Sequence, residues 1–319
     1  MKILLAVDGS ANSDLALARV MSRIWPEGSE CKVVTVNEPW ASKFINLGNP
    51  QLTSLASQAH KALEQDLQEL LDDSTKQLGE KFGAGNVSSQ LMEGKVKNRL
   101  LELANSWGAD LIVMGGPGGE GVNEAGSGKL TARVVSEAPC SVLVARPIPA
   151  ASIAKRADKG LDPTIESRFL VAVNGSANSQ AVLDMVANTP WPAHSKFQVL
   201  TIAEPVRMPV HARLFKAGEI QEMTEKASEV LRKQAEDYAE RCARQLEAKL
   251  GDERVTFHAL EGNARSLILQ IAQDWPADSI LMGAEDEVRT MGEVFFGSTA
   301  QCVLGLADCS VQYFRARKG

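Results

Sequence analysis

The chain has 319 residues, of which 44% are hydrophobic and 23% are charged, and its formal net charge is −6. This length exceeds the roughly 150 residues that one α/β domain needs, so two domains are expected, each with its own core. The negative charge argues against general nucleic-acid binding, no apolar run reaches the roughly 20 residues of a membrane span, and the opening run 3–7 is too short for a signal peptide. A cytoplasmic protein is therefore expected.

Short apolar runs alternate with longer helical patterns along the first half of the chain. The expected order is strand 2–8, a helix ending near 24, strand 32–37, helix 52–82, strand 87–92, helix 95–106, strand 110–114, helix 129–137 and strand 141–145. The strands at 3–7 and 111–114 are apolar throughout, which is typical of a parallel sheet covered by helices on both faces.

The second half of the chain repeats the first. The pentapeptide Gly-Ser-Ala-Asn-Ser at residues 9–13 recurs unchanged at 175–179, an offset of 166. The offset grows to 168 where Met114 maps to Met282, and to 169 where Gly128 maps to Gly297. Such small insertions belong in loops.

The segment between the copies runs from Pro147 to Ser167 and contains three prolines with no helical or strand periodicity. We interpret it as a linker. The predicted organisation is domain 1 at 1–147, the linker at 148–167 and domain 2 at 168–319.

Catalytic and metal-binding groupings are not evident. The four histidines lack metal-ligand spacing, and no Ser/His/Asp or Cys/His arrangement stands out. The five cysteines are scattered without a C-x-x-C pair, which predicts reduced and mostly buried thiols: Cys31, Cys140, Cys242, Cys302 and Cys309.

Two glycine-bearing segments follow apolar strands in the first copy, at residues 8–10 and from Gly115 to Gly128. Ligands of open α/β sheets bind outside the carboxyl ends of the strands, and glycines let backbone N–H groups approach phosphates closely. The second segment is therefore interpreted as a phosphate cradle, with a simple turn as the alternative. It is not a Walker A site, because Asn123 stands where that motif needs glycine and Leu130 replaces the metal-binding hydroxyl.

The spacing of Gly115, Gly118 and Gly128, followed by the segment Ala-Pro-Cys-Ser-Val-Leu-Val at 138–144, resembles the signature of the universal stress protein family. The resemblance covers nearly the whole chain, once in each half. It implies an α/β fold of two tandem Rossmann-like domains, each with a five-stranded parallel sheet of order 3-2-1-4-5 and helices on both faces. That order would bring Asp8 beside the loop that starts at Gly115.

The nucleotide-binding branch of this family implies that domain 1 binds ATP, ADP or AMP, with or without Mg²⁺. Asp8 would contact the ribose or phosphate side, and Ala6 and Val36 would meet the adenine edge mainly through their backbone. Lys129 stands where the family has Ser or Thr, although it could give a point-charge contact to phosphate and Ser127 lies two residues earlier. The candidate site residues of domain 1 are Ala6, Val7, Asp8, Val36, Met114, Gly115, Gly118, Ser127, Gly128 and Lys129.

Domain 2 departs from the family pattern. Asn174 replaces the aspartate, and Glu285 and Asp286 stand where the second glycine belongs, so weak, metal-dependent or no nucleotide binding is expected. The weaker candidates of domain 2 are Asn174, Gly283, Gly297 and Ser298.

The resemblance implies a stress-response regulator or sensor that acts through nucleotide occupancy and protein partners. It also implies that strands 141–145 and 310–314 pair within the chain as a pseudo-dimer, and that whole chains could form a homo-oligomer. The alternatives are an interaction scaffold for partner proteins or an apolar ligand and, third, an ATP hydrolase, which would be slow because no general base is identifiable.

Overall fold

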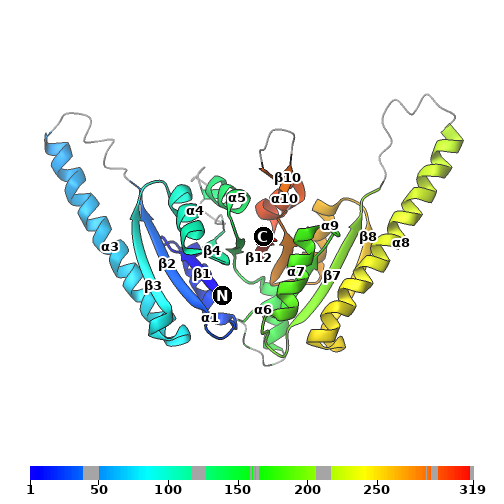
Figure 1. Cartoon of the computed structure of the whole chain (residues 1–319), viewed down its shortest axis with the longest axis horizontal. Coiled ribbons are helices and arrows are strands. Elements are labelled where there is room, and N and C mark those ends of the chain that lie inside the picture. Colours follow the sequence, from blue (N-terminus) through cyan, green and yellow to red (C-terminus); the bar gives the residue numbers. More distant parts are fainter. Residues whose placement is uncertain are drawn as a thin grey trace. The chain divides into compact units, whose positions relative to one another are not determined.

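The computed structural model describes residues 1–38, 50–116, 127–158, 160, 162, 165–205, 217–284, 286–288 and 294–316. The chain divides into two compact units, Met1–Pro147 and Ile148–Gly319. Each unit is an α/β domain with its own parallel sheet (Figure 1).

The first unit alternates strands and helices. Its elements are β1 (Lys2–Ala6), α1 (Ala11–Ser22), β2 (Glu30–Asn37), α3 (Pro50–Phe82), η1 (Ala84–Asn86), β3 (Val87–Glu93), α4 (Val96–Trp107), β4 (Leu111–Gly115), α5 (Ser127–Glu137) and β5 (Ser141–Ala145). The strand order is β3-β2-β1-β4-β5, which confirms the predicted order 3-2-1-4-5. Leu5 lies at the centre of this sheet, in register with Val33 on β2 and Val113 on β4.

The second unit repeats this plan. Its elements are α6 (Ala150–Ala157), β6 (Arg168–Ala172), α7 (Ala177–Asn188), β7 (Lys196–Ala203), α8 (Ala217–Leu250), η3 (Asp252–Arg254), β8 (Val255–Glu261), α9 (Ala264–Asp274), β9 (Ser279–Gly283), β10 (Asp286–Val288), β11 (Val294–Phe296), α10 (Ser298–Leu306) and β12 (Ser310–Phe314). Its parallel strands follow the order β8-β7-β6-β9-β12, with β10 and β11 in a separate hairpin. Val171 takes the place of Leu5, in register with Val199 and Leu281.

Helices cover both faces of the first sheet. On one face Ile3 and Leu5 join a buried cluster with Val20 of α1 and Leu71 of α3. The alternate residue Leu4 is fully buried as well, on the face where α4 contacts β2. Side chains of a strand alternate between faces, so this continuous burial explains the unbroken apolar runs of the sequence.

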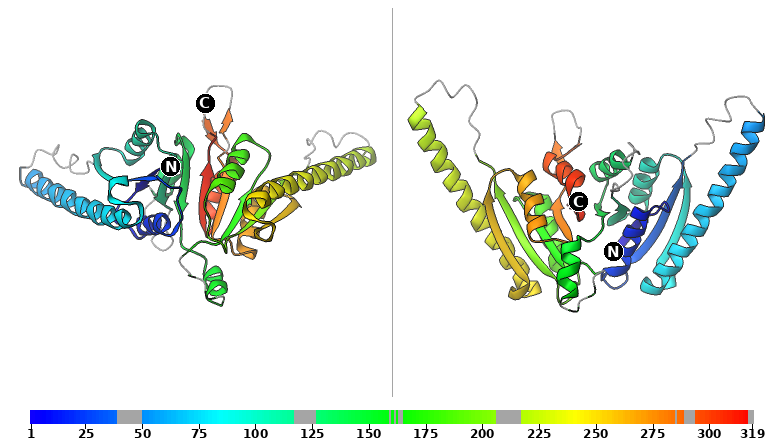
Figure 2. Two further views of the ribbon diagram at one scale, coloured as in Figure 1. Left: turned by 60° about the horizontal axis from the view of Figure 1, so that its bottom comes forward. Right: turned by 180° about the vertical axis from the view of Figure 1, so that it is seen from behind.

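The helices α3 and α8 are longer than the strands that they cover. At 34 residues α8 is roughly 50 Å long, whereas the seven residues of β8 span roughly 23 Å. Both views in Figure 2 show the amino-terminal half of α8 projecting beyond the strands of its own sheet.

The repeated pentapeptide builds the same turn in both units. Gly9 has φ +76° and Gly175 has φ +85°, a conformation that glycine adopts without strain. The next residue caps the following helix: the Oγ atoms of Ser10 and Ser176 each accept a hydrogen bond of 3.2 Å from the backbone N–H three residues later. Much of the repeated sequence therefore serves the strand-to-helix turn.

The linker was expected to be irregular, yet α6 forms within it. Its sequence is rich in alanine, the strongest helix former. A buried contact holds the helix in place, because Ser152 Oγ donates a hydrogen bond of 2.5 Å to Asp278, which is fully buried before β9. A single tertiary hydrogen bond of this kind cannot be read from sequence periodicity.

Candidate functional site

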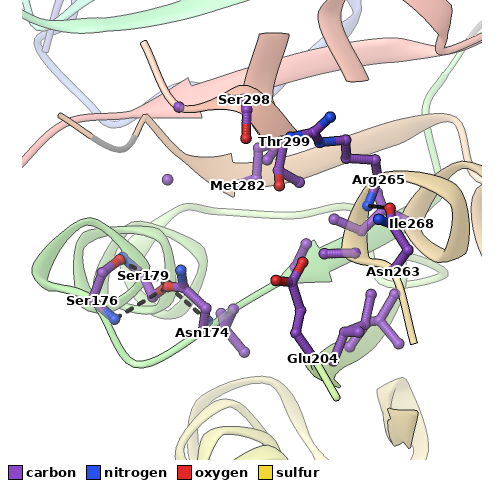
Figure 3. Close-up of a pocket in the computed structure, with 18 residues that line it drawn as sticks. Asn174, Ser176, Ser179, Glu204, Asn263, Arg265, Ile268, Met282, Ser298 and Thr299 are labelled. Carbon is purple, nitrogen blue, oxygen red and sulfur yellow. Dashed lines mark hydrogen bonds between the residues drawn. The ribbon is translucent and has the colours of Figure 1, made fainter. Parts of the chain in front are cut away.

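A cavity of about 520 Å³ lies in the second unit, at the carboxyl ends of β6, β7 and β9 (Figure 3). The amino-terminal ends of α7, α9 and α10 form its other walls. All four candidate residues of domain 2 line the cavity: Asn174, Gly283, Gly297 and Ser298. This is the sheet edge at which open α/β folds bind ligands.

The walls of the cavity divide by chemistry. One part is apolar and includes Ala172, Leu200, Ile202, Ile268 and Met282. The rest is polar and includes Ser176, Glu204, Asn263, Arg265, Ser298 and Thr299. An apolar slot with a few polar groups at one side is typical of a small-molecule site.

The repeat maps this lining onto the candidate residues of domain 1. Ala6, Asp8 and Val36 correspond to Ala172, Asn174 and Ile202 at the offset of 166. The remaining counterparts follow the larger offsets, with Met114 and Gly115 matching Met282 and Gly283, and Gly128 and Lys129 matching Gly297 and Ser298. With Val7, which matches Val173 at the offset of 166, eight candidates of domain 1 thus have counterparts in one cavity of domain 2.

The fold of domain 1 brings several of its candidates to one edge. Because β1 lies between β2 and β4, the carboxyl ends that carry Ala6, Val36 and Met114 are neighbours, and Asp8 and Gly115 follow directly. Lys129 lies exposed in the first turn of α5. Gly118 lies outside the described residues. Ser127 and Gly128 are the first two residues of α5.

Asp8 and Asn174 occupy the same turn with different charge. Asp8 is exposed, and its Oδ1 accepts hydrogen bonds from Ser10 N–H at 3.0 Å and Ser10 Oγ at 2.6 Å. Asn174 Oδ1 likewise accepts from Ser176 N–H at 3.2 Å and from Ser179 Oγ at 2.7 Å. The turn therefore tolerates either side chain, and the carboxylate of Asp8 supplies a negative charge that the same turn lacks in domain 2.

Tyr238 of α8 supports this turn in the second unit. Its ring carbon Cζ lies 4.0 Å from the position that a Cβ atom on Gly175 would take. Burial raises the pKa of Tyr238 to about 12. Gly9 has Leu70 Cδ2 at the corresponding place, 3.8 Å away.

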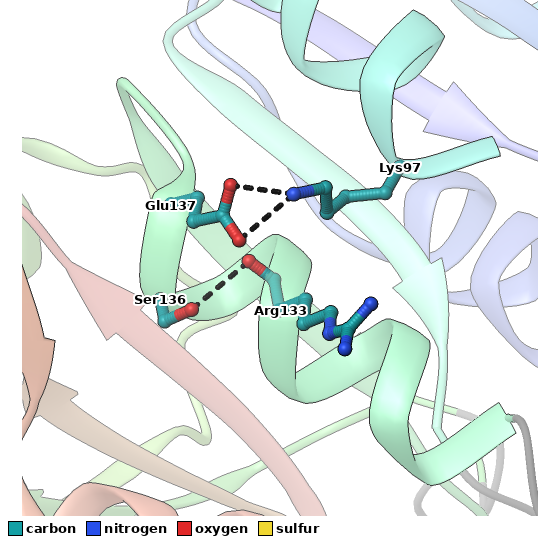
Figure 4. Close-up of polar contacts among 4 residues, drawn as sticks. All are labelled: Lys97, Arg133, Ser136 and Glu137. Atoms are coloured by element: carbon teal, nitrogen blue, oxygen red, sulfur yellow. Dashed lines mark hydrogen bonds and ion pairs between the residues drawn. The ribbon is translucent and has the colours of Figure 1, made fainter. Parts of the chain in front are cut away.

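The helix after β3 and the helix after β8 each carry a cationic side chain in the first turn, but the surroundings of the two side chains differ. In domain 1, Lys97 Nζ contacts both carboxylate oxygens of Glu137, at 2.8 and 3.0 Å, and joins α4 to α5 (Figure 4). The repeat places Arg265 at the position of Lys97 and Leu306 at the position of Glu137. Arg265 lines the cavity instead.

The segment after β9 also differs from expectation. The sequence predicted a loop there, but the chain forms the antiparallel hairpin of β10 and β11, with Glu287 opposite Phe295. Sequence reasoning missed this hairpin because three-residue strands leave no measurable periodicity. It also missed Arg265, although the repeat offset that maps Lys97 to Arg265 would have identified a cation in both units.

No three His, Cys, Asp or Glu side chains gather as a metal site within the described ranges. Among the helices that the structure describes, none combines the length and hydropathy needed to cross a membrane. All five cysteines are free thiols, four of them buried, as the sequence predicted.

Comparisons with known proteins agree with the fold. The family described as "Universal stress protein family" matches residues 1–146 and 167–315. A universal stress protein of Methanocaldococcus jannaschii is 31% identical over 145 residues, which cover 46% of this chain and 81% of that protein. One of Thermus aquaticus is 31% identical over 147 residues, covering 45% of this chain and 97% of that protein.

A solved universal stress protein of Archaeoglobus fulgidus shares the fold over both halves. Its TM-score is 0.57 at 16% identity, and the match covers 98% of this chain and 96% of that one. The family match in each half and the repeated sheet topology lead to the same conclusion. The chain belongs to the universal stress protein family and carries two tandem domains of that family.

Proposed function

We propose that this protein is a stress-response regulator of the cytoplasm whose domain 1 binds ATP or a related adenine nucleotide, with or without Mg²⁺. The observation that supports the proposal is the domain 2 cavity, since eight of its 18 lining residues correspond to candidates of domain 1. Domain 1 adds to this arrangement an exposed carboxylate, Asp8, and an exposed cation, Lys129.

Each candidate has a role in this proposal. Asp8 accepts hydrogen bonds from ribose hydroxyls, while the backbones of Ala6 and Val36 meet the adenine edge. Lys129 faces the phosphates as a point charge at the start of α5. The other members of the site border the base or wrap the phosphates: Val7, Met114, Gly115, Gly118, Ser127 and Gly128.

The proposed activity is binding rather than turnover. Asp8 is held by Ser10 at the ribose side of the site, and hydrolysis would need a base positioned to activate water near the γ-phosphate. Any hydrolysis at this site should therefore be slow, and nucleotide occupancy itself would carry the signal to protein partners.

The proposed assembly follows from the family resemblance. We propose that β5 and β12 pair within the chain, so that the tandem domains form an intramolecular pseudo-dimer, and that whole chains associate further. In a chain whose native cysteines are replaced, cysteines introduced on β5 and β12 should then crosslink within one chain under mild oxidation, whereas crosslinking only between chains would contradict the pairing.

The nucleotide proposal has a direct test. Protein purified without added nucleotide is denatured with acid, and the supernatant is analysed by chromatography and mass spectrometry. Release of ATP, ADP or AMP supports the proposal. If no nucleotide is released and millimolar ATP with Mg²⁺ leaves the melting temperature unchanged, the proposal fails.

A second candidate function has one supporting observation. The projecting parts of α3 and α8 expose large apolar side chains, with Leu55 61%, Met223 70% and Val230 55% accessible. Exposed apolar residues on amphipathic helices favour protein contacts, as in an interaction scaffold. Leu55→Ser and Met223→Ser would weaken partner capture in a scaffold without affecting nucleotide release, which separates the two functions.

A further inference from the structure

Three polar side chains from different elements share one face of the first sheet, the face that α3 covers. They are Asn37 at the end of β2, Glu93 at the end of β3 and His60 on α3, and we call them the α3 cluster. Asn37 and Glu93 are register partners on neighbouring parallel strands, so their side chains point to the same face. The Nε2 atom of His60 lies 3.7 Å from Oε1 of Glu93, which places this face under α3. Figure 1 shows α3 running along β3.

The amide of Asn37 is buried without a hydrogen bond. The residue is 2% exposed, and neither its Oδ1 nor its Nδ2 has a partner among the residues that the structure describes. The Nδ1 atom of His60 is also buried and has no partner within the described part of the chain. Buried polar atoms of this kind cost free energy on folding unless protein, ordered water or an ion satisfies them. The α3 cluster is therefore suited to contact a group that is not part of the chain.

The second unit shows that the fold does not require these side chains. At the offset of 166 Asn37 corresponds to Ala203, which is buried as well. The offset of 168, which aligns the carboxyl-terminal ends of α3 and α8, places Ser228 at the position of His60 and retains only the glutamate, as Glu261. Because alanine fits the same buried place, the polar side chains point to a function that is specific to domain 1.

The chemistry of the α3 cluster suits a divalent transition metal. Imidazole nitrogen and carboxylate oxygen both bind Zn²⁺, whereas Mg²⁺ and Ca²⁺ prefer oxygen ligands. The separation of 3.7 Å between His60 and Glu93 is too long for a hydrogen bond, but it is close to the roughly 3.4 Å between two ligand atoms of one tetrahedral Zn²⁺. The side chain of Glu93 is 72% exposed, so a metal can enter from solvent and a water molecule can complete the coordination.

We propose that His60, Glu93 and Asn37 bind one Zn²⁺ ion in domain 1, through Nε2, the carboxylate and Oδ1 respectively. Because these ligands come from three elements, the metal links α3 to the edge of the sheet formed by β2 and β3. The proposal does not rest on nucleotide binding, since none of the three side chains is a candidate for the nucleotide site.

The test is Zn²⁺ binding by the full chain after metals have been removed with a chelator. Zn²⁺ alone is titrated by calorimetry into the unmodified protein and its variants. We expect one site that depends on the α3 cluster, with an affinity at least tenfold lower in His60→Ala and in Glu93→Gln and several-fold lower in Asn37→Ala. Hydrogen exchange followed by mass spectrometry should slow in the amino-terminal half of α3 when Zn²⁺ is added, and it should not slow in His60→Ala.

The matched control is His258→Ala, which removes an exposed histidine of β8 and should leave the Zn²⁺ affinity unchanged. Asn37→Ala reproduces the alanine of the second unit, so without metal its melting temperature should not fall. Circular dichroism should verify that every variant folds.

Three outcomes would overturn the proposal. An unchanged Zn²⁺ affinity in His60→Ala would assign the metal to other groups, such as the thiols, which all variants keep. A lower melting temperature of metal-free Asn37→Ala with unchanged Zn²⁺ affinity would show that the amide serves the fold. The third is the absence of Zn²⁺ binding by the unmodified protein at micromolar concentration.

Discussion

The backbone of Asn12 leaves no room for a side chain at Gly115. A Cβ atom on Gly115 would lie 2.5 Å from the carbonyl oxygen of Asn12 and 2.7 Å from its Cβ. The second unit repeats the contact, with the Cβ position of Gly283 at 2.7 Å from Asn178 Cβ. The first glycine of the family spacing is therefore required for packing of β4 against α1, apart from any contact with a ligand.

Gly115→Ala should consequently destabilise domain 1. Its methyl group would meet backbone atoms, which can move only with the strand or the helix, so we expect a loss of about 1–3 kcal/mol in the free energy of unfolding. Urea titration followed by tryptophan fluorescence measures this loss. Gly85→Ala is the matched control, because nothing lies within 4 Å of that Cβ position, and equal effects at both sites would contradict the packing argument.

The sequence predicted the features that depend on residues close together in the chain. Gly9 and Ser10 were visible as a repeat because every copy of the turn needs a positive φ and a helix cap. The strand order also followed from the resemblance. Gly115 was recognised as part of a motif, but its packing role was not, since that role depends on the distance between β4 and α1.

Asp278 should be one of the most sensitive polar positions of the second unit. It is fully buried and accepts hydrogen bonds from Ser152 Oγ at 2.5 Å, Ser167 N–H at 2.6 Å and Arg168 N–H at 2.9 Å. Asp278→Ala leaves these donors without their acceptor, which should cost about 3 kcal/mol or more of unfolding free energy. Urea denaturation measures the effect.

The exposed Asp274 of α9 provides the control for this change, and Asp274→Ala should alter stability by less than about 0.5 kcal/mol. Ser152→Ala should detach α6 without unfolding the domain. Limited proteolysis would then cleave within 150–157 faster than in the unmodified protein. An unchanged cleavage rate would show that Ser152 does not hold the helix.

Buried cysteines should resist alkylation in the folded protein. Burial raises the pKa of Cys31 to about 12 and raises the pKa of Cys242 as well. Because the thiolate is the reactive form, both should react with iodoacetamide at pH 8 more slowly than the partly exposed Cys302. Mass spectrometry of the labelled peptides gives the rates, and modification of Cys31 as fast as Cys302 would contradict the burial.

The raised pKa of Cys31 also has a consequence for stability. Above the ordinary pKa of a thiol, the unfolded chain releases this proton while the folded chain keeps it. The free energy of unfolding should therefore fall as the pH rises toward 12. Cys31→Ala should reduce this dependence.

The contrast between Lys97 and Arg265 can be tested by transferring the missing carboxylate. Leu306 is 66% exposed, so a polar side chain fits there, and Leu306→Glu would reproduce the position of Glu137. The new carboxylate should pair with Arg265 and add up to about 1 kcal/mol to the free energy of unfolding at low salt, as measured by urea titration. Leu306→Gln should have little effect, and an equal gain in both variants would argue against an electrostatic cause.

The features that the sequence did not reveal depend on tertiary contacts. The helix α6 rests on the hydrogen bond between Ser152 and Asp278, which lie 126 residues apart. The β10–β11 hairpin is too short to leave a pattern. The sequence alone does not distinguish Arg265, because an arginine in the first turn of an exposed helix is usually a solvated charge, whereas the structure places it beside a cavity.

ATP binding is proposed for domain 1, which carries Asp8. Calorimetric titration of ATP with Mg²⁺ into the full chain, Asp8→Ala and Asn174→Ala tests this assignment. We predict one ATP site per chain, an affinity loss of about 10- to 100-fold in Asp8→Ala through the lost charged hydrogen bonds, and no loss in Asn174→Ala. No binding at millimolar ATP, or equal losses in the two variants, would contradict the claim.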